Sequence, residues 1–104
     1  MIHRSLPYLV AGCALAFAIG GCSSSQYTNL TVPQCVAEAK LALRDADFTQ
    51  NLEVTGVGDD RAVSGEHGSY RGSVYCVPGK RTVEVTGLDL AMAQFYKKSI
   101  IKRF

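Results

Sequence analysis

The sequence predicts an α+β fold: a small two-layer sandwich in which two helices cover one face of an antiparallel sheet. Three observations lead to this prediction. Apolar residues recur at helical spacing between residues 32 and 46, polar and apolar residues alternate between residues 52 and 87, and a second apolar segment follows Gly87. The order of elements is α-β-β-β-α, with a fourth strand if the short segment 61–65 also pairs. Such an order favours an antiparallel sheet with both helices on one side.

Residues 1–21 have the composition of a secretory signal peptide. Met1 to Arg4 is a short basic start, Leu6 to Ile19 is an apolar core, and small residues end the segment. An uncleaved membrane-spanning helix is one alternative, but spanning a bilayer takes about 20 apolar residues, and this run is shorter and contains Pro7. A signal peptide cut after Ala18-Ile19-Gly20 is the other alternative.

The segment Ile19-Gly20-Gly21-Cys22 resembles the lipobox of bacterial lipoproteins, in which an aliphatic residue and two small residues precede a lipid-modified cysteine. The resemblance covers these residues and the signal peptide before them. It implies removal of residues 1–21, a diacylglyceryl thioether on Cys22 and an acyl group on its amine. Two or three acyl chains hold a protein stably at a membrane.

Ser23 stands where lipoproteins retained at the inner membrane often carry Asp. The resemblance therefore implies the inner leaflet of the outer membrane, facing the periplasm, or the cell membrane if the host has no outer membrane. Residues 22–30 are polar and serine-rich, and we predict a flexible tether there. A single domain of residues 31–104 then follows.

The charge balance gives no indication of a nucleic-acid partner. The chain has 11 Lys plus Arg against 9 Asp plus Glu, and loss of Arg4 with the leader brings the two closer still. The remaining domain is small and has no Trp. A core of this size is marginally stable without a further constraint.

Cys35 and Cys76 are predicted to form one disulfide. Cys13 lies in the leader and Cys22 takes the lipid, so these two cysteines remain in an oxidising compartment. A cross-link that closes a loop of about 40 residues adds on the order of 4 kcal/mol in the chain-entropy model. A zinc site is the alternative, but two cysteines with His67 make a poor ligand set, and no metal or cofactor is expected.

The first helix is predicted to begin at Thr31 and to end near Ala46. Thr31 and Gln34 have the spacing of a capping box, and Pro33 is tolerated in a first turn. The apolar residues that share one helical face are Val32, Cys35, Val36, Ala39, Ala42, Leu43 and Ala46. Cys35 is on this face, where a disulfide directed at the core needs it.

Strands are predicted at residues 52–57, 61–65, 69–77 and 81–87, because these segments alternate and turn residues separate them. Val77-Pro78-Gly79-Lys80 matches a type II turn, so the last two strands form a hairpin. Asp59 and Asp60 belong to a turn, since the spaced acidic ligands of a calcium loop are missing.

The second helix is predicted to begin after Asp89, a suitable N-cap, and to run to the end of the chain. Its apolar residues are Leu90, Met92, Phe95, Tyr96, Ile100 and Ile101. Its last turns hold Lys97, Lys98, Lys102 and Arg103, where positive charge suits the helix dipole and can also meet anionic headgroups or an acidic partner.

The sheet face turned away from the helices offers a candidate binding surface. If Val74, Cys76, Val83 and Val85 face the helices, the opposite side exposes Arg71, Ser73, Tyr75 and Glu84, together with Glu53, Thr55, Thr82 and Thr86. An aromatic ring among charges of both signs can bind a protein. An ordinary solvated sheet face has the same composition.

The function expected from these features is a non-enzymatic, lipid-anchored periplasmic module that binds an envelope or secreted protein, as an accessory subunit or an immunity-type protein. One alternative is a cell-wall or small-ligand binding module that uses the face around Tyr75 and Arg71. A second is a small hydrolase that uses His67 with Glu66 or with Ser64 or Ser69, but no nucleophile motif surrounds either serine.

Overall fold

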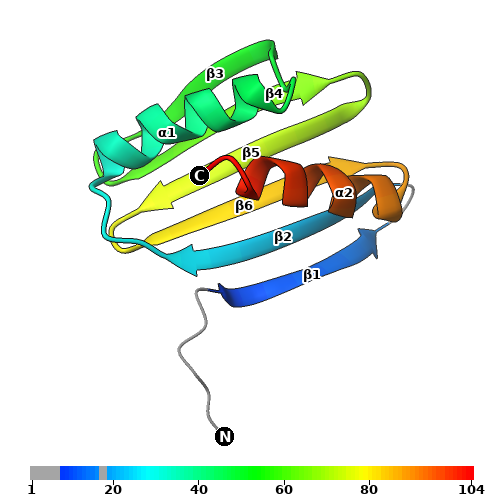
Figure 1. Cartoon of the computed structure of the whole chain (residues 1–104), viewed down its shortest axis with the longest axis horizontal. Helices are drawn as coiled ribbons and strands as arrows, with labels where there is room; N and C mark the ends of the chain where they lie inside the picture. Colours follow the sequence, from blue (N-terminus) through cyan, green and yellow to red (C-terminus); the bar gives the residue numbers. More distant parts are fainter. Residues whose placement is uncertain (1–7, 17–18) are drawn as a thin grey trace, which may run out of the picture.

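Six strands form one antiparallel sheet in the spatial order β1-β2-β6-β5-β4-β3. The structure is a computed structural model, and it describes residues 8–16 and 19–104. Figure 1 shows the strands side by side, with α1 and α2 lying across them. The predicted α+β class is confirmed: the sheet is antiparallel, and the two helices pack on it.

Two strands, β1 (Tyr8–Ala16) and β2 (Ile19–Tyr27), precede the first helix and were not predicted. They come from the segments predicted to be a leader and a tether, so residues 22–27 lie in a strand in the full chain. β2 pairs with β6 from Gly20 opposite Gly87 to Tyr27 opposite Lys80. Serine and glycine favour strands little, but the free edge of β6 supplies pairing partners, and this tertiary context overrides propensity. The basic start Met1–Arg4 lies outside the described residues.

The first helix, α1 (Val32–Asp45), begins as predicted. The Thr31 hydroxyl accepts a hydrogen bond from the Gln34 backbone N–H at 3.2 Å, and the Gln34 side chain accepts one from the Thr31 N–H at 2.9 Å. This reciprocal pair is the capping box. The side chains that α1 buries are Val32, Cys35, Val36, Ala39, Ala42 and Leu43, all of them on the predicted face.

Four strands then form a meander: β3 (Gln50–Val57), β4 (Asp60–His67), β5 (Tyr70–Val77) and β6 (Lys80–Gly87). The fourth strand of the prediction is therefore present, and β4 is longer than residues 61–65. Gly79 has a φ of 77°, the left-handed conformation that the third position of a type II turn requires. The turn between β4 and β5 is at residues 68–69, because Glu66 and His67 still pair with Arg71 and Tyr70.

The second helix, α2 (Leu90–Ile101), begins at the predicted N-cap. The Asp89 carboxylate accepts hydrogen bonds from the backbone N–H groups of Ala91 at 2.8 Å and Met92 at 3.2 Å. The buried face of α2 holds Ala93, Lys97 and Ile100. Lys97 is thus separated from Lys98 and Lys102, with which the sequence grouped it, because its position in the helical repeat turns it toward the sheet.

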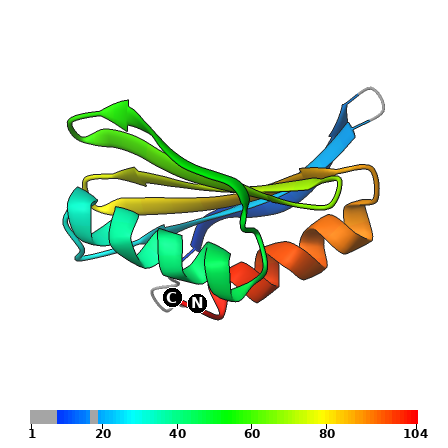
Figure 2. The same ribbon diagram turned by 90° about the horizontal axis from the view of Figure 1, so that it is seen from above.

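Both helices lie on the same side of the sheet, and the other side is open (Figure 2). The core lies between the helices and the sheet. Among the side chains whose burial the structure describes, its buried apolar members are Cys22, Val32, Cys35, Val36, Ala39, Ala42, Leu43, Phe48, Val63, Val74, Cys76, Val83, Val85, Ala93 and Ile100. The predicted assignment of Val74, Cys76, Val83 and Val85 to the helix side is confirmed by their burial.

The prediction of one disulfide is wrong for the full chain, which has two. Cys35 on α1 bonds to Cys76 on β5, with 5.9 Å between their Cα atoms; this is the pair expected from the sequence. Cys13 on β1 bonds to Cys22 on β2. The second bond was missed because Cys13 was assigned to a discarded leader, whereas the β1–β2 pairing places the two residues directly opposite each other.

Candidate functional site

The open face of the sheet carries most of the candidate site residues. Side chains alternate between the two faces of a strand, so Arg71, Ser73 and Tyr75 of β5 share the face opposite to Val74 and Cys76. Pairing places Ser73 across from Glu84 on β6, and Tyr75 across from Thr82. The structure therefore brings the predicted surface together on two adjacent strands.

Tyr75 and Glu84 form a direct pair at the centre of this face. The Tyr75 hydroxyl donates a hydrogen bond to the Glu84 carboxylate, with 3.0 Å between the oxygens. Partial burial raises the pKa of the Tyr75 phenol above its ordinary value, and the negative charge and hydrogen bond of Glu84 raise it further. With 41% of its surface exposed, Tyr75 presents a neutral ring beside a carboxylate that faces solvent.

Arg71 lies further along the same strand, between two carboxylates. Its guanidinium is 3.4 Å from the Glu66 carboxylate and 3.6 Å from that of Glu53. All three side chains are partly exposed, so each ion pair contributes little to stability. The pairs do order the guanidinium, which presents its remaining donors to solvent at this edge of the face.

Ser73 does not belong to an exposed surface, contrary to the prediction. It is 5% exposed, and its hydroxyl is 2.9 Å from the hydroxyl of Ser64 on β4. Its short side chain lies in the middle of the sheet, between the longer side chains of Arg71 and Tyr75 on the same face of β5. The accessible part of the predicted surface is therefore Arg71, Tyr75, Thr82, Glu84 and Thr86, with Glu53 and Thr55 on β3.

Cys22, the predicted lipid-attachment residue, lies on the helix side of β2 near the start of α2. It pairs with Val85 on β6, and its sulfur atom is 3.6 Å from the carbonyl oxygen of Leu90. In the full chain, this sulfur is bonded to Cys13, and the residue is buried. A thioether and a disulfide cannot coexist on one sulfur atom. Lipid attachment at Cys22 therefore excludes the Cys13–Cys22 bond.

The structure places His67 on the opposite face of β4 from Ser64 and Glu66, two of the residues of the hydrolase alternative. His67 lies on the helix side of β4, where its Nδ1 donates a hydrogen bond to the Asp47 carbonyl at 3.1 Å and its ring packs against Phe48 and Tyr96. Ser64 and Glu66, at even positions of the same strand, face the open side. The histidine is thus a packing residue that closes the end of the core.

Arg81 is a structural centre that the sequence analysis missed. Its guanidinium donates a hydrogen bond to Gln26 on β2 at 2.7 Å, lies 3.9 Å from the Glu38 carboxylate on α1, and stacks 3.8 Å above the ring of Phe104. The alternation of β6 could have indicated this role, since Arg81 shares the buried face of that strand with Val83 and Val85. The arginine joins β2, α1 and the carboxyl end of the chain.

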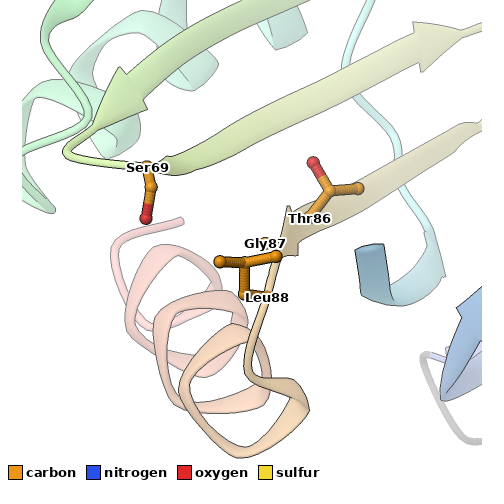
Figure 3. A pocket seen from close by; sticks show the side chains of 4 residues that line it. All are labelled: Ser69, Thr86, Gly87 and Leu88. Carbon is orange, nitrogen blue, oxygen red and sulfur yellow. The ribbon is translucent and has the colours of Figure 1, made fainter. Parts of the chain in front are cut away.

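A shallow hollow lies at the end of the sheet where α2 begins. It is lined by Ser69, Thr86, Gly87 and Leu88, which Figure 3 shows around the connection from β6 into α2. The lining has hydroxyl and apolar groups and no charged side chain, so it offers little to orient a polar substrate.

Within residues 8–16 and 19–104, no three His, Cys, Asp or Glu side chains gather where they can hold a metal ion. In the same part of the chain, neither helix is long and apolar enough to cross a bilayer. Asp59 and Asp60 lie exposed at the β3–β4 turn.

Comparison with known proteins supplies no relative: the chain matches no protein-family model, no curated protein and no solved structure.

Proposed function

We propose that this protein is a lipid-anchored lipoprotein of the bacterial envelope whose small, disulfide-bonded domain binds another envelope or secreted protein through the open face of its sheet. It acts without catalysis, as an accessory or immunity-type module. One observation carries the proposal: the same chain has a lipobox-like cysteine, Cys22, and a domain with one open sheet face.

The distribution of the core supports removal of the leader. Apart from Cys22 itself, the buried apolar side chains named above all lie between residues 32 and 100. Loss of residues 1–21 removes β1 and the first residues of β2, together with the contacts of α2 with β1, but it leaves the contacts that the strands β3 to β6 and the two helices make with one another. We infer that the contacts that remain are enough for the domain to fold after cleavage.

The Cys35–Cys76 bond supports export to an oxidising compartment. It joins α1 to β5 across 41 positions of the chain and lies in the core, where both residues are fully buried. Disulfides of this kind persist in the periplasm and are rare in the cytosol.

The open face supports protein binding rather than catalysis. Tyr75 and Arg71 belong to the residue types enriched at the centres of protein interfaces. Both are held in place by carboxylates, Tyr75 by Glu84 and Arg71 by Glu66 and Glu53. Side chains that are ordered before binding lose less conformational entropy when a partner arrives.

The test is site-specific photo-cross-linking in the native host, with the photoreactive residue at Thr55. Thr55 is exposed on β3 and pairs with Ala62 on β4, which in turn pairs with Tyr75 on β5. We expect a defined protein adduct that is lost when Glu84→Lys is added. The matched control places the same photoreactive group at Leu41, which is exposed on α1, on the side of the sheet opposite to the open face.

Absence of an adduct at Thr55, or the same adducts from Leu41, contradicts binding through the open face. An adduct that sediments with peptidoglycan would instead identify the cell-wall alternative.

A further inference from the structure

We propose that the outer face of α2 rests on the surface of an anionic lipid bilayer and fixes the orientation of the domain at the membrane. This inference rests on the proposed lipid anchor at Cys22. The outer face of α2 is defined by the exposed residues that share one side of this helix: Ala91, Met92, Phe95, Lys98 and Lys102. Leu88 is exposed on the segment that leads into the helix.

The first half of this face is apolar. Leu88 is 67% exposed, Phe95 62% and Met92 38%. Figure 3 shows Leu88 on the segment that leads into α2, beside the hollow at the end of the sheet. Single exposed apolar residues are ordinary, but large ones gathered on consecutive turns of one helix indicate a surface that is covered in use.

The second half of the face is basic. Lys98 and Lys102 follow Phe95 on the same side, and Arg103 comes next. The helix from Leu90 to Ile101 contains no acidic residue, and the Asp89 carboxylate before it is engaged by the N–H groups of Ala91 and Met92. Apolar and basic side chains on one helical face suit the boundary between acyl chains and anionic headgroups.

The anchor lies between the sheet and the first turn of the helix that carries this face. The Cys22 sulfur is 3.6 Å from the Leu90 carbonyl in the first turn of α2. From Cys22 onward, β2 is paired with β6, so the lipid-bearing residue belongs to the folded body and no long linker separates the two. Acyl chains that leave Cys22 therefore bring the bilayer to the beginning of α2.

The resulting orientation turns the binding surface toward a partner. The helices and the open face lie on opposite sides of the sheet (Figure 2). With α2 on the membrane, Tyr75 and Glu84 point away from it, into the periplasmic space. A protein or a second copy of the chain can also cover an apolar helical face, but neither explains its position beside the anchor.

The test uses tryptophan fluorescence, because the native chain has no Trp. The lipidated protein carrying Phe95→Trp is purified from membranes and reconstituted into phosphatidylglycerol-containing vesicles with brominated acyl chains, which quench tryptophan on contact. The control is Val57→Trp; Val57 is 83% exposed and lies at the opposite end of the sheet from Leu88, because it pairs with Asp60 at the β3–β4 turn. Met92→Trp replaces Phe95→Trp if the latter does not fold.

We expect the emission of the Phe95→Trp variant to shift to shorter wavelength and to be quenched at least about twofold more than that of the control. Adding Lys98→Glu and Lys102→Glu should reduce the difference. Equal quenching of the two reporters, or a blue shift of the Phe95→Trp emission without quenching by brominated lipid, would overturn the inference in favour of solvent or a protein on this face.

Mass spectrometry of the same preparation tests the lipid anchor separately. Absence of lipid on Cys22 overturns the proposed function and this inference together. Presence of the lipid with equal quenching overturns this inference alone.

Discussion

The Tyr75 hydroxyl is held in its protonated form by its surroundings. Burial and the Glu84 carboxylate raise the pKa of the phenol above the ordinary value of 10.0. The folded state therefore keeps this proton at pH values where the unfolded chain releases it. The stabilising contribution is fully present below pH 10.0 and is lost as the pH rises through the pKa of the folded state.

We expect Tyr75→Phe to lower the free energy of unfolding by about 0.5 kcal/mol at neutral pH, because an exposed hydrogen bond to a carboxylate contributes modestly. As the pH rises past the ordinary tyrosine value, the wild-type chain should lose stability more steeply than the variant. Urea unfolding across this range measures both curves. Parallel curves would show that the Tyr75–Glu84 pair carries no linked proton.

The pKa of Lys97 is shifted downward, so its effect on the pH dependence of stability is opposite to that of Tyr75. Its side chain is 3% exposed, and burial lowers its pKa below 10.5, with a further contribution from the charge of Lys98. Near the ordinary lysine pKa, the unfolded chain binds more protons than the folded one, so this residue makes stability rise with pH in that interval. The cost of burying the charged form is present at neutral pH.

We expect Lys97→Met to raise the free energy of unfolding at neutral pH by about 1 kcal/mol, a modest gain because the aliphatic stem of the lysine already packs against the core. The gain should shrink as the pH approaches 10.5. Lys40→Met, at an exposed position of α1, is the control and should change little. A variant no more stable than wild type at neutral pH would refute a burial cost at Lys97.

At the scale of elements, two glycines let the end of α1 approach the sheet. A side chain at Gly65 on β4 would collide with the backbone carbonyl of Phe48, and one at Gly72 on β5 would press on the side chains of Phe48, Ile100 and Leu43. The Phe48 backbone is fixed by a hydrogen bond from its N–H to the Leu43 carbonyl at 2.8 Å. The Phe48 backbone therefore cannot move away from Gly65 to make room for a side chain there.

We expect Gly65→Ala to destabilise the domain by about 2 kcal/mol or more, because a backbone contact cannot be relieved by a side-chain rotation. Gly58→Asn is the control: Gly58 has a φ of 59° and open space around it, and Asn tolerates the left-handed conformation. Thermal unfolding followed by circular dichroism compares the two. Equal melting temperatures would contradict the close packing of the α1–β3 connection on the sheet.

The sequence predicted those elements whose signals are local. Helix and strand boundaries are fixed by hydrogen bonds or dihedral angles within a few residues, as at Thr31 with Gln34, at Asp89, and at Pro78 with Gly79. The alternation of polar and apolar residues assigned the faces of β5 and β6. It did not predict β1 and β2, since a Gly-Gly-Cys-Ser-Ser-Ser segment becomes a strand only through its pairing with β6. Ser73 was misplaced because its exposure depends on neighbouring side chains rather than on alternation.

At the scale of the whole molecule, the proposed function requires that the domain fold without residues 1–21. We expect a chain of residues 22–104 with Cys22→Ser to unfold cooperatively and to keep the Cys35–Cys76 bond. β2 then becomes the edge of a five-stranded sheet, β2-β6-β5-β4-β3. Amide hydrogen exchange should show that the β6 amides that pair with β5 and those that pair with β2 are both protected. Loss of cooperative unfolding would show that β1 belongs to the fold.

The measurement that tests the account most directly is the intact mass of the protein extracted from membranes of its native host, with fragmentation across Cys22. We expect a chain that begins at Cys22, carries a diacylglyceryl thioether with an acyl group on its amine, and has its Cys35–Cys76 bond intact. A chain that retains residues 1–21, with Cys22 bonded to Cys13 or unmodified, would contradict it.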